Sequence, residues 1–241
     1  MSSTSPISNH RHNLPAQVSS FIGRSPELEE LSRLLRQHRL VTLTGAGGAG
    51  KTRLALHAVT SEVDGFRDGV WLVELAPLTA PELVVGAIAR VVGAPIAQAE
   101  SPLDALGRFL SGKRLLLVLD NCEHLLSECD RVVGSLLARC PAITVLTTSR
   151  EPLAIAGEVV LRVPPLSLPV LPGQKHPLDV EQLLDYDAVH LFVERACAAE
   201  PSFRLSHVTA KSVVEICQRL DGIRWHWNWP PGACAGWASP T

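Results

Sequence analysis

The sequence lacks the features that mark several classes of protein. Its 22 lysines and arginines are nearly balanced by 24 aspartates and glutamates, and the basic residues form no dense run. This balance argues against a nucleic-acid-binding surface. No apolar stretch approaches the ~20 residues that a membrane helix needs. Residues 1–13 are polar and contain no hydrophobic segment, so we expect no secretory signal, no membrane partner and a cytoplasmic protein.

Metal-binding cysteine spacing is also absent. The six cysteines are Cys122, Cys129, Cys140, Cys197, Cys217 and Cys234, and no two of them form a C-x-x-C pair. Structural zinc sites and redox pairs usually need such spacing, so we expect free thiols of a cytoplasmic chain. The sequence shows no internal repeat. Its excess of arginine over lysine, with abundant alanine, glycine and proline, is typical of a bacterial genome rich in G+C.

What the sequence does contain is a phosphate-binding loop. Residues 45–52 read GAGGAGKT, which is the full G-x-x-x-x-G-K-[ST] pattern. Its glycines let successive backbone N–H groups surround an anion in a shape that a Cβ would obstruct. We expect Lys51 to reach the β- and γ-phosphates and the Thr52 hydroxyl to bind Mg²⁺. The predicted nucleotide-binding residues here are Gly45, Ala46, Gly47, Gly48, Ala49, Gly50, Lys51, Thr52 and Arg53.

The flanking pattern predicts an α/β fold. A β-branched stretch precedes the loop and a helix-forming stretch follows it, so the loop should lie at a helix N-terminus, where the peptide dipole favours phosphate. The alternation of elements predicts a P-loop NTPase fold, with a parallel five-stranded sheet sandwiched by helices and a small helical subdomain after it. Strands are predicted at 39–44, 69–75, 114–120, 143–148 and 159–163, and helices at 25–38, 81–92, 102–110, 123–138, 187–199 and 207–220.

The predicted organisation has five parts. A flexible N-terminus covers 1–20, a P-loop ATPase α/β domain covers 21–163, a Pro-rich linker covers 164–180, and a partial helical subdomain covers 181–223. Residues 224–241 contain four of the five tryptophans, unlike the chain before them. Restoring one lost C in a codon reading after Ile223 yields Ile-Pro-Leu-Ala-Leu-Glu-Leu-Ala-Ala. We therefore expect a frameshift, natural or from sequencing, with a genuine divergent tail as the alternative.

Polar residues follow the third predicted strand. Asp120 closes this apolar strand at its carboxyl end, where open α/β sheets bind ligands, so we predict that it holds Mg²⁺ directly or through water. An aspartate that merely ends a strand is the alternative. Asn121 comes next, and its amide can orient water but cannot take a proton, which predicts slow hydrolysis. Glu123 is the nearest acid, and it is either catalytic or only favourable charge at a helix start.

A second polar group follows the fourth predicted strand. Arg150 is a candidate γ-phosphate sensor that would distinguish ATP from ADP, and a solvent-exposed loop arginine is the alternative. The predicted catalytic set is Lys51, Asp120, Glu123 and Arg150, and the predicted metal ligands are Thr52 and Asp120.

These motifs together resemble one family. Phe21-Ile22-Gly23-Arg24, the loop at 45–52, the block at 117–125 and Thr148–Leu153 occur in that order, and the set is similar to the STAND class of P-loop signalling ATPases. Those AAA+-like, NB-ARC-related proteins include bacterial transcriptional regulators. The resemblance spans about 14–222 and implies that Phe21, Ile22, Gly23 and Arg24 contribute to the nucleotide pocket. It also implies that ATP or ADP occupancy controls an oligomeric or open state, which hydrolysis resets.

The leading hypothesis is an ATP-binding switch module of a bacterial transcriptional regulator, with ATP, ADP and Mg²⁺ as ligands, slow hydrolysis and self-association on ATP binding. We recognise no DNA-binding domain in the sequence. A truncated, non-functional remnant is the main alternative, because the family's Gly-x-Pro-Leu-Ala segment is missing after Gly222. A metabolic kinase would need an acceptor site and an arginine-rich lid, and neither is seen. A GTPase is disfavoured because the N-K-x-D guanine-reading motif is absent.

Overall fold

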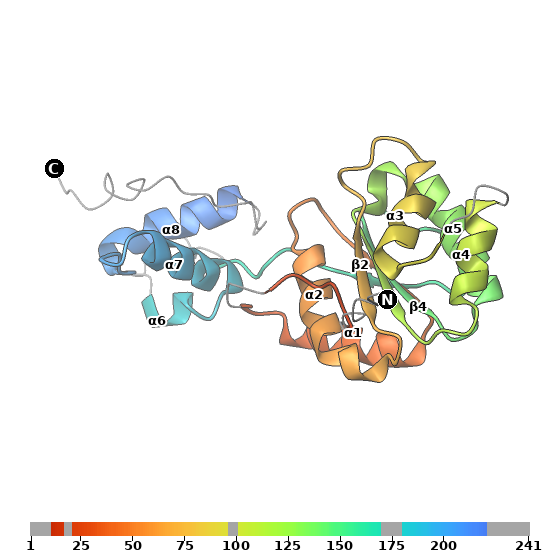
Figure 1. Cartoon of the computed structure of the whole chain (residues 1–241). Coiled ribbons are helices and arrows are strands. Elements are labelled where there is room, and N and C mark those ends of the chain that lie inside the picture. The colour runs from red at the N-terminus through yellow and green to blue at the C-terminus, as the bar shows by residue number, and fades with distance from the viewer. Residues whose placement is uncertain (1–10, 17–20, 96–100, 170–179, 221–241) are drawn as a thin grey trace, which may run out of the picture. The chain divides into compact units, whose positions relative to one another are not determined.

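The structure is a computed structural model of the 241-residue chain, and it describes residues 11–16, 21–95, 101–169 and 180–220 (Figure 1). These residues form two compact units. The first contains 11–16, 25–45 and 51–162, and the second contains 21–24, 46–50, 163–169 and 180–220. The phosphate loop is divided between the two units. Gly45 and Lys51 belong to the first unit, and residues 46–50 belong to the second.

The first unit is built on a parallel sheet of five strands in the order β2-β3-β4-β1-β5. Each pair of neighbours is parallel, and β1, β3 and β4 are buried along nearly their whole length. Burial on both faces explains why these strands have continuous apolar runs and little alternation. The prediction of a five-stranded parallel sheet is confirmed. The strands are β1 (Leu40–Thr44), β2 (Val70–Glu74), β3 (Leu116–Asp120), β4 (Thr144–Ser149) and β5 (Val159–Arg162).

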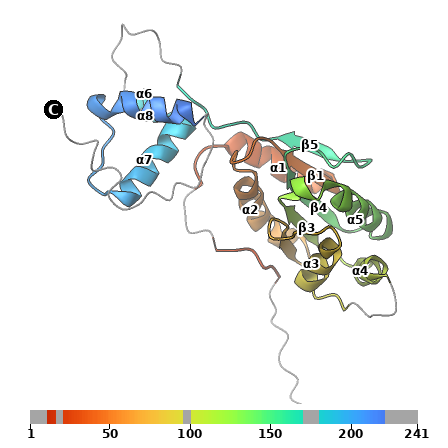
Figure 2. The same ribbon diagram turned by 90° about the horizontal axis from the view of Figure 1, so that it is seen from above.

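Helices cover both faces of this sheet. α1 and α2 pack together on one side, and α3, α4 and α5 pack together on the other, as Figure 2 shows for α1, α2, α4 and α5. The apolar stripes of α3, α4 and α5 and the strand residues that face them form one hydrophobic core cluster. The helices are α1 (Ser25–Gln37), α2 (Lys51–Glu62), α3 (Leu83–Val92), α4 (Pro102–Leu110) and α5 (Leu126–Arg139), with short 3₁₀ turns η1 (Val63–Gly65) and η2 (Cys122–His124).

The helix predicted from Glu123 begins three residues later than expected. Asn121 adopts a left-handed backbone with φ of 67°, and Leu125 has φ of −130°, so the chain makes the turn η2 before α5 starts at Leu126. Glu123 consequently lies in η2, and the acid in the first turn of α5 is Glu128. Glu123 is thus the acid in the first turn of η2 and not of α5, and its two interpretations, catalytic acid and helix-start charge, both stay predictions.

The N-terminal segment 11–16 pairs with the edge of β2, although the sequence predicts a flexible N-terminus over 1–20. The Asn13 side chain accepts a hydrogen bond from the Leu72 N–H at 2.7 Å and donates one to the Leu72 carbonyl at 2.8 Å. The Arg11 carbonyl accepts a further bond from the Val70 N–H at 2.8 Å. A carboxamide has the same donor and acceptor as a peptide group, so Asn13 satisfies backbone groups that an edge strand would leave open.

The second unit is helical in its C-terminal part. It contains α6 (Val180–Leu183), α7 (Asp187–Ala199) and α8 (His207–Arg219), which enclose a small core with Phe192 at 1% exposure. The predicted helices at 187–199 and 207–220 agree with α7 and α8 to within one residue. A capping box, formed by Ser206 and Thr209, fixes the start of α8.

Residues 163–169 belong to this helical unit. Leu166 packs in its core, and the Ser167 hydroxyl accepts a hydrogen bond from the Asp187 N–H at 2.8 Å, at the start of α7. The rest of the predicted linker up to 179, and the tryptophan-rich tail at 224–241, lie outside the described residues. Every helix that the structure describes is too short or too polar to cross a bilayer.

Candidate functional site

The phosphate loop joins the end of β1 to the first residue of α2. Gly50 has φ of 88°, a left-handed conformation that residues with a Cβ rarely adopt, and α2 starts at the next residue. The first turn of α2 contains no acidic side chain of its own to offset the positive end of the helix dipole. The loop therefore leads into a helix N-terminus that favours an anion, as its sequence predicts.

Lys51 is the buried cation of this site. Lys51 is only 8% exposed, and its Nζ donates a hydrogen bond to the Gly45 carbonyl at 2.9 Å. Burial lowers the pKa of Lys51, and the charge of Arg150 lowers it further, whereas the carboxylates of Glu123 and Asp120 oppose the shift. A buried ammonium group so close to the loop is well suited to pair with phosphate oxygens.

Thr52 and Asp120 meet at the carboxyl end of the sheet. The Thr52 hydroxyl, in the first turn of α2, donates a hydrogen bond to Oδ1 of Asp120 at 2.6 Å. Hydroxyl and carboxylate oxygens are ligands that Mg²⁺ prefers, so these two residues fit such an ion. In the described residues, no group of three or more His, Cys, Asp or Glu side chains could hold a metal. A divalent ion here would therefore need water or phosphate oxygens as its remaining ligands.

Thr148 is a site residue to which the sequence analysis assigned no role. Its hydroxyl donates a second hydrogen bond to Oδ1 of Asp120 at 2.6 Å and accepts one from the Asn121 N–H at 2.9 Å. Thr148 is 1% exposed and lies near the end of β4, which is the neighbour of β3. In the sequence it closes the predicted strand at 143–148, as Asp120 closes the one at 114–120, and it begins the motif Thr148–Leu153.

Glu123 and Arg150 form an ion pair beside these groups. Arg150 Nε lies 3.3 Å from Glu123 Oε1, and the arginine side chain is 66% exposed. Such exposed pairs contribute only about 0–1 kcal/mol, so a stronger anion could replace Glu123 as the partner of Arg150. Since both charges act on Lys51, the structure brings together all four residues predicted to be catalytic, namely Lys51, Asp120, Glu123 and Arg150.

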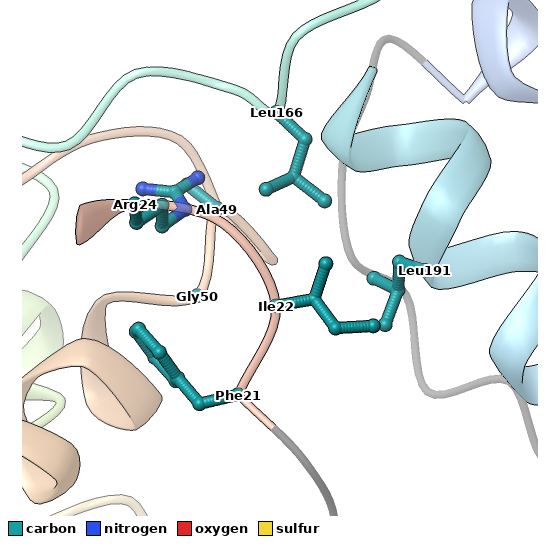
Figure 3. A pocket seen from close by; sticks show the side chains of 7 residues that line it. All are labelled: Phe21, Ile22, Arg24, Ala49, Gly50, Leu166 and Leu191. Carbon is teal, nitrogen blue, oxygen red and sulfur yellow. The ribbon is translucent and has the colours of Figure 1, made fainter. Parts of the chain in front are cut away.

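The second unit contains an apolar pocket beside the phosphate loop. Figure 3 shows Phe21, Ile22, Leu166 and Leu191 around it, with the loop residues Ala49 and Gly50 in its wall. Arg24 also lines the pocket. The full set is Phe21, Ile22, Arg24, Ala49, Gly50, Leu166 and Leu191. The predicted motif at 21–24 and the phosphate loop therefore meet, and Leu166 and Leu191 are additions that the sequence did not suggest.

Two contacts fix the motif at 21–24 in the second unit. Arg24 is 7% exposed and donates a hydrogen bond from Nη2 to the Pro164 carbonyl at 2.6 Å. Gly23 has φ of 66°, and a Cβ on it would lie 2.2 Å from Oδ1 of Asp187. The motif is thus held closely against α7, which explains the need for glycine at this position.

The thiols do not form a site in the described part of the chain. Cys122, Cys129, Cys140 and Cys217 are buried and Cys197 is half-buried, and all five are free. Burial raises the pKa of Cys217 to about 11, which keeps that thiol protonated and unreactive. The prediction of free thiols is confirmed for these five, and Cys234 lies outside the described residues.

The chain is similar in sequence to a domain family and to two mycobacterial proteins. A family model described as an AAA domain matches residues 33–155, just over half of the chain. A Mycobacterium tuberculosis protein named as an HTH-type transcriptional regulator is 46% identical over 190 residues, which is 79% of this chain and 20% of the relative. A second protein of that organism, named as uncharacterized, is 41% identical over 213 residues, covering 88% of this chain and 50% of the relative. The chain thus spans at most half the length of these relatives.

A solved structure is similar in fold. It is a signal transduction ATPase with numerous domains (STAND) with a tetratricopeptide repeat sensor, from Pyrococcus horikoshii. The match has a TM-score of 0.50 and 16% identity, and it covers 88% of this chain and 30% of that one. At this identity the likeness is one of fold, and it agrees with the parallel sheet and the loop–helix junction described above.

Proposed function

This chain belongs to the AAA domain family, and from that premise we propose that it is an ATP-binding switch module of a bacterial transcriptional regulator, with slow Mg²⁺-dependent hydrolysis. The observation that carries the proposal is the 2.6 Å contact between Thr52 and Asp120. It joins the first turn of the helix after the phosphate loop to the end of β3. In P-loop ATPases, residues at these two positions hold the Mg²⁺ that accompanies the nucleotide phosphates.

Phosphate recognition follows from the loop and its lysine. Residues 45–50 supply backbone N–H groups, and Lys51 would exchange its contact with the Gly45 carbonyl for the β- and γ-phosphates. Bound Mg²⁺ would neutralise phosphate charge, with Thr52 and Asp120 as its protein ligands. Arg53, next to Thr52, belongs to the same predicted set.

Base recognition is assigned to the apolar pocket. Ile22, Leu166 and Leu191 offer an apolar surface that suits a flat purine ring. The sequence has no N-K-x-D motif for guanine, so we assign the pocket to adenine. Gly23 and Arg24 would act here by keeping Ile22 in place against α7.

Switching would use the exposed pair of Glu123 and Arg150. A γ-phosphate is a stronger partner for an arginine than a carboxylate across 3.3 Å, so ATP would draw Arg150 away from Glu123 and ADP would not. Such a difference between nucleotides is what a switch requires. The relative named as an HTH-type transcriptional regulator and the STAND structure support a regulatory role, and self-association in the ATP state is the output we propose.

The experiment that tests this proposal is nucleotide binding with Mg²⁺ to the wild type and to Lys51→Ala. We expect the wild type to bind ATP and ADP and to reject GTP, and Lys51→Ala to lose most of its affinity. Lys211→Ala is the matched control, because Lys211 is exposed on α8 and forms an ion pair there with Glu215, at 3.9 Å. Equal ATP binding by wild type and Lys51→Ala would refute the assignment. No binding by any of the three would favour a non-functional remnant.

A further inference from the structure

The candidate site has no obvious group to take a proton from the attacking water. Asn121 cannot accept one. Asp120 already accepts hydrogen bonds from Thr52 and Thr148 on one oxygen, as a residue held in place to bind an ion would. Glu123 is paired with Arg150 at 3.3 Å. Because ATP would draw Arg150 away and free Glu123, the candidates for a general base are Glu123 and any carboxylate that a neighbouring element places beside the site.

Glu74 is the carboxylate that the sheet places next to Asp120. It is the last residue of β2, and in the parallel pairing of β2 with β3 its direct partner is Asp120. The Leu75 N–H donates to the Asp120 carbonyl at 3.0 Å, so the pairing holds to the very end of both strands. Neighbouring strands lie about 4.8 Å apart and paired residues project to the same face, so the Glu74 side chain projects beside that of Asp120.

Glu74 also differs from the other acids in its surroundings. It is exposed at the carboxyl edge of the sheet, where ligands of such sheets bind. Within the described part of the chain, its side chain makes no hydrogen bond or ion pair. Its carboxylate is therefore available to water without any prior change, whereas Asp120 is hydrogen-bonded to two threonines and Glu123 becomes available only after Arg150 leaves it.

We propose that Glu74 is the general base for the attacking water in ATP hydrolysis, an inference that rests on the ATPase function proposed above. The water oxygen forms a bond to the γ-phosphorus while one of its protons passes to the Glu74 carboxylate. The bond between the γ-phosphorus and the β–γ bridging oxygen breaks, and its electron pair stays on that oxygen of ADP. The second water proton remains on the released phosphate, and Glu74 returns its proton to solvent.

The test compares the full chain with Glu74→Gln, which keeps the size of the side chain but cannot take a proton. Glu82→Gln is the matched control, since Glu82 is an exposed acid just before α3 on the same β2–α3 connection. The measurements are ATP affinity, single-turnover phosphate release, and the nucleotide that stays bound after incubation with ATP and gel filtration. We expect Glu74→Gln to bind ATP within about two-fold of wild type and to release phosphate on the order of 100-fold more slowly.

Bound nucleotide gives a readout independent of rate. Wild type and Glu82→Gln should carry ADP after the incubation, and Glu74→Gln should carry ATP. Equal phosphate release by Glu74→Gln and Glu82→Gln would overturn the inference. A wild type that binds ATP but releases no phosphate would overturn it too while leaving the binding function intact, whereas a wild type that fails to bind ATP would refute the proposed function itself.

Discussion

Thr148 donates its hydroxyl hydrogen to Oδ1 of Asp120 across 2.6 Å, from the neighbouring strand of the sheet. The same hydroxyl accepts the Asn121 N–H, so Thr148 links the carboxylate to the backbone of the residue after it. That residue has a left-handed φ of 67°, an uncommon conformation that needs support. One hydroxyl thus holds both the proposed metal ligand, Asp120, and the turn that follows it.

Replacing Thr148 with valine, which has the same shape without the hydroxyl, tests this role. Loss of two hydrogen bonds at a residue that is 1% exposed should lower the free energy of unfolding by about 1–2 kcal/mol. It should also raise the Mg²⁺ concentration needed for half-maximal ATP binding, because Asp120 loses one of the two hydrogen bonds that hold its carboxylate in place. Urea unfolding and Mg²⁺ titration of ATP binding measure the two effects.

The control for this prediction is Thr147→Val. Thr147 is fully buried and its hydroxyl shares a 2.7 Å hydrogen bond with that of Thr42, away from Asp120. This variant should lose comparable stability without any change in Mg²⁺ dependence. If both variants shift Mg²⁺ dependence equally, the role of Thr148 is only structural.

The sequence predicts the sheet well because buried parallel strands have a distinctive signal. Continuous apolar runs such as residues 115–119 can form few other structures between helical patterns. The phosphate loop is equally clear, since its glycines, lysine and threonine have fixed spacing. These signals are local, and each element can be recognised without knowing its neighbours.

The parts that the sequence did not predict depend on which strands are neighbours. Thr148 and Glu74 become site residues only because β4 and β2 flank β3 and end level with it. The turn η2 was missed because it depends on a left-handed backbone at Asn121, which residue type alone does not dictate. Asn13 was missed for the same reason as Thr148, since its contacts lie 59 residues away along the chain.

Arg150→Ala should reduce the preference for ATP over ADP. The arginine is exposed and pairs only weakly with Glu123, so the free energy of unfolding should change by less than about 1 kcal/mol. ATP affinity should fall by roughly ten-fold while ADP affinity stays nearly constant, because only ATP has the γ-phosphate. Titration of both nucleotides by calorimetry measures this.

Arg131→Ala is the matched control for Arg150→Ala. Arg131 is similarly exposed, at 56%, and pairs with Glu128 at 2.6 Å on α5. It should leave both affinities unchanged. A parallel loss of ATP and ADP affinity in Arg150→Ala would mean that Arg150 does not read the γ-phosphate.

Gly23→Ala should disrupt the second unit. The substitution combines a left-handed φ of 66° with a Cβ placed 2.2 Å from the Asp187 carboxylate, so the loop at 21–24 must move away from α7. We expect a loss of stability above about 2 kcal/mol and weaker ATP binding through the displaced Ile22. Chemical denaturation and ATP titration measure the two.

Gly93→Ala separates the backbone strain from the clash. Gly93 has a similar φ of 73°, but no atom of the described residues lies within 4 Å of the position a Cβ would take. This variant should lose only about 1 kcal/mol and keep its ATP affinity. If Gly23→Ala resembles it in both respects, the contact with Asp187 does not position the motif.

Lys51→Met should stabilise the nucleotide-free protein while abolishing ATP binding. Burial lowers the pKa of Lys51 below its usual 10.5, so the folded state gives up a proton that the unfolded state still holds. Stability of the wild type must then rise with pH from the folded pKa up to 10.5, because the unfolded state binds more protons in that window. Below the window the buried charge costs stability, and methionine removes that cost.

The advantage of Lys51→Met in free energy of unfolding should therefore be largest near neutral pH and shrink as pH approaches 10.5, which urea unfolding at several pH values measures. A constant advantage across pH would show that Lys51 titrates as an ordinary exposed lysine.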